Sequence, residues 1–163
     1  MRNASVTVVR GRAVSSTRIR SYIDDRKLSR AARLLTRPFF FDADIVRGEG
    51  VGRTLDFPTA NARLSDPHKL VPPGGVYAVR VRLDNLTHAG MMNIGRAPTV
   101  RRDGGRTIEI HLFDFTGELY GRRMRINCLK FIREEKKFSD RAALRSQLEK
   151  DREAVRLIME KKY

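Results

Sequence analysis

The chain has 163 residues, a formal net charge of +15 and a single cysteine, Cys128. Its length suits one domain with its own hydrophobic core, and a lone cysteine excludes a disulfide framework or a thiolate metal cluster, which fits a reducing cytoplasm. There is no signal-like apolar segment at the N-terminus, and no apolar run approaches the roughly 20 residues that span a bilayer. We therefore expect a cytoplasmic protein that does not enter membranes.

The positive charge raises nucleic acid as a partner, because basic domains attract phosphate backbones. However, the basic residues are spread from Arg2 to Lys162, Trp is absent, and aromatic residues make up only 7% of the chain. A solvated basic surface is therefore favoured over a dedicated nucleic-acid face.

The first 37 residues predict a short strand at Val6–Val8 followed by two short helices. Ser15 or Ser16 can cap the first helix, because a hydroxyl accepts hydrogen bonds from the free amides of a first turn. Apolar residues from Leu28 to Leu35 recur at helical spacing in the second helix. The Arg37-Pro38 step ends it, because proline disfavours helical geometry at the residue before it.

From residue 38 the pattern predicts β-structure and then one long helix. Short segments rich in β-branched or aromatic residues, separated by turn residues, indicate a mainly β, closed antiparallel barrel of five or six strands. The strands we expect are Phe39–Arg47, Val76–Leu83, His88–Ile94, Thr107–Phe115 and Met124–Ile132. The final helix begins after Ser139 as N-cap, and its apolar residues should pack across the barrel: Leu144, Leu148, Val155 and Ile158 or Met159.

Two adjacent segments after the first expected barrel strand are candidates for phosphate and metal binding. Gly48, Gly50 and Gly52, followed by Arg53, make a loop whose amides can approach an anion, although an ordinary turn explains the glycines equally well. In Pro58-Thr59-Ala60-Asn61, the Thr59 hydroxyl and the Asn61 amide oxygen lie two residues apart on an extended segment. They can offer Mg²⁺ two oxygen ligands on one side, whereas an ordinary proline turn is the alternative.

Glu109 is the candidate general base. Strand alternation places Ile108, Ile110 and Leu112 on the core face, and Glu109, His111 and Phe113 on the opposite face. A carboxylate beside a substrate hydroxyl can accept its proton in phosphoryl transfer, whereas a solvent-facing glutamate is the commoner explanation of such a residue. His111 is interpreted as structural.

Seven motifs follow one another along the chain: the glycine-rich loop, Phe57–Asn61, Pro72–Ala78, Met92–Thr99, Glu109–Phe115, Leu119–Gly121 and Ile132–Phe138. Taken in this order, they resemble the motifs of the riboflavin kinase family, and the resemblance covers the chain from about Arg37 to its end. The resemblance implies a six-stranded antiparallel Greek-key barrel with a C-terminal helix, which binds ATP with Mg²⁺ and the substrate riboflavin and makes FMN.

The resemblance also implies roles for single residues. Thr59 and Asn61 would bind Mg²⁺ and the ATP phosphates, with Gly48, Gly50, Gly52 and Arg53 in the nucleotide loop and Tyr120 near the nucleotide. Glu109 would be the general base on the ribityl hydroxyl. Arg133, Lys136 and Phe138 would lie on a loop that closes over the flavin, where a planar guanidinium can stack on a flat ring.

A second resemblance concerns residues 1–37. Val14–Arg20 is similar to the last motif of the nucleotidyltransferase module that precedes the kinase in bacterial FAD synthetases. The paired histidines of that module have no counterpart here, so we expect a remnant at 1–37, a kinase at 38–163, and a separate or deleted adenylyltransferase module. The alternatives are a non-catalytic barrel that binds flavin or nucleic acid, or the kinase half of an FAD synthetase that needs its missing half.

Three positions depart from the family pattern, which usually has glycine where this chain has Thr36, Ala43 and Asp56. Asp56 matters most, because a carboxylate would repel an incoming triphosphate unless it turned outward or were paired.

Overall fold

The computed structural model describes residues 8–9, 12–13, 15–47, 57–96 and 105–161. Its core is a closed barrel of six antiparallel strands in the order β3-β4-β7-β6-β5-β8. The strands are β3 (Phe39–Val46), β4 (Ala60–Leu64), β5 (Gly75–Leu83), β6 (Leu86–Arg96), β7 (Arg106–Leu112) and β8 (Arg123–Arg133). Because β8 returns beside β5 after the β5-β6-β7 meander, the connection is a Greek key. The expected mainly β fold is confirmed.

The sequence pattern located five of the six strands to within a few residues, and β4 is the one it described only as an extended segment. Its residues, Ala60 to Leu64, include Ala, Asn and Arg rather than β-branched side chains, so local propensity gives no strand signal. Pairing with β3 and β7 holds it in the sheet.

Before the barrel, a short hairpin of β1 (Val8–Val9) and β2 (Arg12–Ala13) leads into α1 (Ser16–Asp24) and α2 (Leu28–Leu35). The Ser15 side chain accepts a hydrogen bond from the amide of Arg18 and caps α1, as expected. Thr36 ends α2 with a φ of 59°, in the left-handed region that favours glycine. The glycine expected at this position from the family pattern therefore has a physical reason.

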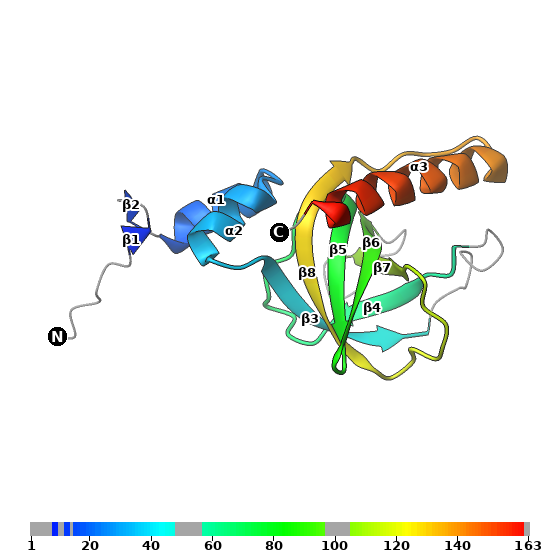
Figure 1. Cartoon of the computed structure of the whole chain (residues 1–163), viewed down its shortest axis with the longest axis horizontal. Coiled ribbons are helices and arrows are strands. Elements are labelled where there is room, and N and C mark those ends of the chain that lie inside the picture. The colour runs from blue at the N-terminus through cyan, green and yellow to red at the C-terminus, as the bar shows by residue number, and fades with distance from the viewer. Residues whose placement is uncertain (1–7, 10–11, 14, 48–56, 97–104, 162–163) are drawn as a thin grey trace.

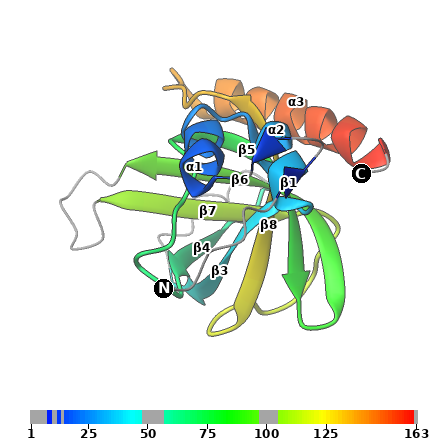
Figure 2. The ribbon, with the colours of Figure 1, turned by 90° about the vertical axis from the view of Figure 1, so that its left-hand side faces the viewer.

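The two N-terminal helices lie at one end of the barrel, as Figures 1 and 2 show. Ile23, Leu28 and Ala31 are at most 2% exposed and belong to the same hydrophobic cluster as the barrel interior. The buried side chains of these helices therefore extend the hydrophobic core of the barrel, and the helices are not an appendage in solvent.

The last helix, α3 (Arg141–Glu160), crosses the outside of the barrel and contacts β6 and β8. Its N-cap is Asp140, whose side chain accepts from the amide of Ala143, so the expected cap at Ser139 was wrong by one residue. A second hydrophobic cluster lies between α3 and the outer face of the sheet; it includes Phe57, Met91, Phe113 and Val155. Both faces of this part of the sheet are therefore covered.

Candidate functional site

One row of side chains crosses the outer face of five neighbouring strands. Directly paired residues of antiparallel strands point to the same side of a sheet, and Ile108 and Ile110 belong to the interior cluster, so Glu109 between them points outward. The pairs Asn61–Glu109, Glu109–Asn93, Asn93–Val76 and Val76–Arg133 follow one another across the barrel. We call this the outer row: Asn61, Glu109, Asn93, Val76 and Arg133.

Four residues of the outer row, Glu109, Asn93, Val76 and Arg133, line a first cavity of about 300 Å³ between the barrel, the segment 133–138 and the start of α3. Its walls are largely apolar, with Val76, Met91, Met92, Leu144 and Leu148 among the lining residues. A cavity of this size and character suits a small organic molecule with a flat apolar part.

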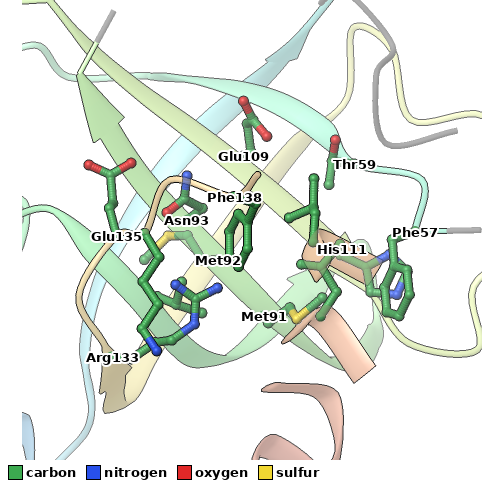
Figure 3. A pocket seen from close by; sticks show the side chains of 14 residues that line it. Phe57, Thr59, Met91, Met92, Asn93, Glu109, His111, Arg133, Glu135 and Phe138 are labelled. Carbon is green, nitrogen blue, oxygen red and sulfur yellow. The ribbon is translucent and has the colours of Figure 1, made fainter. Parts of the chain in front are cut away.

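Charged and polar side chains reach the first cavity from several sides. Glu109 comes from β7, Asn93 from β6, and Arg133 from the end of β8. Figure 3 shows Glu109 and Thr59 on one side of this cavity, Arg133 and Glu135 on another, and Phe138 between them. A ligand held here would meet a carboxylate on one side and a guanidinium on the other.

Thr59 lines both the first cavity and a second one of about 110 Å³. Asn61 and Tyr120 also line the second cavity, and Tyr120 is 41% exposed. Asn61, which faces the second cavity, is the direct cross-strand partner of Glu109, which faces the first. The residues predicted to act on donor and acceptor therefore lie on neighbouring strands.

His111 holds the segment that carries Thr59. It is 8% exposed, and its Nδ1 lies 2.9 Å from the carbonyl oxygen of Pro58. Burial lowers the pKa of His111, although the hydrogen bond to Pro58 raises it, so the ring is neutral at pH 7 and its Nδ1–H donates to that carbonyl. The rings of Phe57 and Phe113, 5.2 and 5.6 Å away, complete its surroundings.

Arg133 is fixed by α3. Its Nε lies 3.0 Å from both carboxylate oxygens of Asp151, its Nη2 lies 2.7 Å from Oδ2, and its Nη1 donates to the Glu134 carbonyl at 2.8 Å. Asp151 is 2% exposed and also accepts from Gln147 Nε2 at 2.9 Å. The charge of the buried carboxylate is therefore matched by the guanidinium.

Asp151 was missed in the sequence, although a signal for it exists. Leu144, Leu148, Val155 and Ile158 define the apolar stripe of α3, and position 151 completes its spacing of three and four residues. A carboxylate at an apolar position of a helix indicates a buried partner of opposite charge. Asn93 and Glu135 were also given no role, although both line the first cavity.

The other predicted site residues divide into two groups. Lys136 and Phe138 line the first cavity beside Arg133, and the Arg133 guanidinium lies 5.8 Å from the centre of the Phe138 ring. The glycine-rich loop, with Gly48, Gly50, Gly52 and Arg53, lies outside the described residues, as does Asp56.

Within the residues that the structure describes, no three His, Cys, Asp or Glu side chains gather as a metal-binding group. Thr59 and Asn61 instead offer a neutral hydroxyl and a neutral amide oxygen beside the second cavity. This donor set fits Mg²⁺ that takes its negative ligands from a phosphate-bearing substrate, which is how magnesium is usually bound.

In the described part of the chain, none of the helices combines the length and apolar character needed to cross a membrane.

Comparisons with a family model and with curated protein sequences point to one family. The family described as riboflavin kinase (flavokinase) matches residues 35–159. The bifunctional riboflavin kinase/FMN adenylyltransferase of Listeria monocytogenes is 39% identical over 148 residues, which cover 91% of this chain and 47% of that protein. The protein of the same description from Bacillus subtilis is 40% identical over 146 residues, with 88% and 46% covered. The chain thus spans about half the length of these curated relatives.

Solved structures give the same fold. A crystal structure described as a macrolide-efflux protein from Streptococcus pneumoniae has a TM-score of 0.84 and 34% identity, over 93% of this chain and 49% of that one. The riboflavin kinase of Trypanosoma brucei has a TM-score of 0.53 and 23% identity, over 76% and 81% of the two chains; at that identity the likeness concerns the fold alone.

Proposed function

The chain belongs to the riboflavin kinase family, and from this premise we propose that it transfers the γ-phosphoryl group of ATP to the 5′-hydroxyl of riboflavin, giving FMN and ADP. One observation carries the proposal. Thr59 lines both cavities, with Glu109 in the first and Asn61 in the second, so a donor and an acceptor can meet beside it.

The first cavity is the proposed site of riboflavin. Its apolar walls suit the flat ring system, and Arg133 and Phe138 offer a guanidinium and an aromatic ring to its face. Glu109 and Thr59 lie on the side of the cavity away from Arg133. A riboflavin whose ring lies toward Arg133 can therefore extend its ribityl chain toward Glu109.

The second cavity is the proposed site of the terminal phosphates of ATP. Thr59 and Asn61 would hold Mg²⁺ there, and the ion would neutralise charge on the transferred phosphoryl group. Tyr120 would lie near the nucleotide. Gly48, Gly50, Gly52 and Arg53 remain predicted contacts of the phosphates.

In the proposed reaction, the 5′-hydroxyl oxygen forms a bond to the γ-phosphorus while the bond from that phosphorus to the bridging oxygen of ADP breaks. Glu109 accepts the proton of the hydroxyl, and ADP leaves with the electron pair of the broken bond. The remaining contribution of the protein is to align donor and acceptor. His111, through Pro58, keeps the segment with Thr59 in place for this step.

The test is to incubate the chain with riboflavin, ATP and Mg²⁺ and to separate riboflavin, FMN and FAD by chromatography. FMN as the product that accumulates supports the proposal. Riboflavin binding without FMN would favour a non-catalytic barrel, whereas FAD would contradict the proposal that the chain carries phosphoryl transfer without adenylyl transfer.

A further inference from the structure

We propose that Asp151 is a positioning residue for substrate binding: it fixes the plane of the Arg133 guanidinium so that Arg133 meets the ring system of riboflavin by its flat face. This inference rests on the proposed function, because it takes a flat heteroaromatic substrate in the first cavity as given. It assigns a role to α3 beyond covering the sheet.

The hydrogen bonds of Arg133 fix the plane of its guanidinium group. A guanidinium donates only in its own plane, and here Nε and Nη2 donate to Asp151 while Nη1 donates to the carbonyl of Glu134. All three nitrogens of the group are therefore directed at the protein. Two of its five N–H groups and its flat face remain for a ligand, and the face can stack on an aromatic ring.

The ion pair of Arg133 and Asp151 is largely buried. The side chains of Arg133 and Asp151 are 14% and 2% exposed, and replacing a buried ion pair by apolar residues is often neutral for stability. Position 151 belongs to an apolar stripe that leucine would continue. Orientation of Arg133 is therefore a use for this carboxylate that an apolar side chain could not supply.

Two neighbouring side chains, Gln147 and Phe138, contact the ion pair of Arg133 and Asp151. Gln147, one turn earlier on α3, donates to Asp151 Oδ1 and restricts the rotation of the carboxylate. The Phe138 ring, whose centre lies 5.8 Å from the guanidinium, lines the same cavity. A flat ligand in that cavity would therefore meet a guanidinium whose orientation is set before binding, which lowers the entropic cost of binding.

The test is a double-mutant cycle on riboflavin affinity, measured by quenching of riboflavin fluorescence in the presence of MgADP. The variants are Asp151→Asn, Arg133→Met and the two combined, with Glu153→Gln on the exposed side of α3 as the matched control. We expect about a tenfold rise in the riboflavin Kd for each single variant, equivalent to about 1.4 kcal/mol. The combined variant should bind no worse than Arg133→Met alone, because Asp151 acts through Arg133.

A structural role alone would give a different result. In that case Asp151→Asn lowers the Tm but leaves the riboflavin Kd at the wild-type value, or its effect adds fully to that of Arg133→Met, and either result overturns the proposal. Arg133→Lys keeps the charge but not the plane, so wild-type affinity in that variant also overturns it. In steady-state kinetics, Asp151→Asn should raise the KM for riboflavin more than the KM for ATP.

The experiment also gives an answer if Asp151→Asn does not fold or if the wild-type protein makes no FMN. If Asp151→Asn does not fold, the apolar pair Arg133→Met/Asp151→Leu leaves no buried charge unpaired; riboflavin affinity equal to that of Arg133→Met supports the proposal, and weaker affinity contradicts it. Wild-type protein that binds riboflavin but makes no FMN would overturn the proposed function while leaving this cycle measurable. Wild-type protein that does not bind riboflavin overturns both.

Discussion

At the scale of single residues, the setting of Glu109 is the most telling feature of the site. It lies between Asn61 and Asn93 in the outer row, so the residues paired with it on the two neighbouring strands carry neutral amide side chains. It also lines a cavity with largely apolar walls. A carboxylate in such surroundings can act on a substrate hydroxyl that enters the cavity.

We expect Glu109→Gln to lower kcat by about 10²- to 10⁴-fold, the usual contribution of a general base. The riboflavin Kd should change little, because the amide keeps the shape of the side chain. Stopped-assay kinetics and fluorescence quenching measure the two quantities, with the exposed Glu153→Gln as the control. Turnover at the wild-type rate in Glu109→Gln would remove this residue from the mechanism.

We expect Thr59→Ala to raise the Mg²⁺ concentration needed for half-maximal activity by about tenfold, because loss of a ligand worth about 1.4 kcal/mol has that effect. Thr59→Ser keeps the hydroxyl and should stay close to wild type. The measurement is initial rate against Mg²⁺ concentration at saturating riboflavin. An unchanged magnesium dependence in Thr59→Ala would argue against the assignment of this ligand.

Some of these residues could be found in the sequence and others could not. Alternation along one strand is a local property, so it placed Glu109 and His111 on the outer face correctly. The cross-strand pairing of Glu109 with Asn61 and Asn93 depends on register across β4, β7 and β6, which the sequence of no single strand specifies. The family motifs indicated which segments contribute to the site, but the cross-strand partners of Glu109 could be identified only from the fold.

At the scale of secondary-structure elements, the barrel closes where its first and last strands, β3 and β8, pair. Two ion pairs lie directly across this junction: Asp42 with Arg125 at 2.8 Å, and Asp44 with Arg123 at 2.9 Å. Hydrogen bonds from these arginines lower the pKa of both carboxyl groups below the ordinary value of 3.8. The four side chains are all 30% or more exposed, so solvent weakens each pair.

The lowered pKa values predict how this junction responds to acid. The unfolded chain takes up protons near pH 3.8 and the folded chain only at lower pH, so the stabilisation is present above about pH 3.8 and is lost as the pH falls through the folded pKa values. We expect the Tm of wild type to fall more steeply between about pH 5 and pH 2.5 than that of Asp42→Asn/Asp44→Asn. Asp24→Asn is the control; equal slopes would contradict the expectation.

The turn between α1 and α2 reaches the segment that borders the first cavity. Arg26 donates to the carbonyl of Gly74 at 3.1 Å and to Glu134 Oε2 at 3.0 Å, and its guanidinium lies 4.9 Å from the centre of the Phe131 ring. Glu134 follows Arg133, whose Nη1 donates to the Glu134 carbonyl. The segment is therefore held by the N-terminal helices on one side and by α3 on the other.

We expect Arg26→Met to raise the riboflavin Kd a few-fold, because it removes the ion pair that restrains Glu134 while methionine keeps an apolar contact with Phe131. The Kd of MgADP should stay unchanged, since the second cavity lies elsewhere. Arg30→Met, an exposed position on α2, is the matched control. Equal losses in the affinity of both ligands would indicate general destabilisation instead.

At the scale of the whole molecule, the buried apolar side chains of the described residues form two hydrophobic clusters. The interior of the barrel is one, and the layer between α3 and the outer face of the sheet is the other. The first cavity lies where this outer layer ends, near Leu144 and Leu148. The long helix was evident from its periodicity, but its crossing direction, and hence the meeting of Asp151 with Arg133, follows from packing that residue spacing does not encode.

The packing of the N-terminal helices gives a prediction for the whole chain. Ile23 is fully buried in the barrel cluster, so Ile23→Ala should destabilise the barrel itself by about 2–5 kcal/mol, the usual cost of removing a large core side chain. The measurement is urea unfolding followed both by circular dichroism and by loss of riboflavin binding; the two curves should shift together. If residues 1–37 formed an independent appendage, the binding curve of Ile23→Ala would coincide with that of wild type. A shared shift would mean that the boundary expected at residue 37 separates two stretches of sequence but not two folding units.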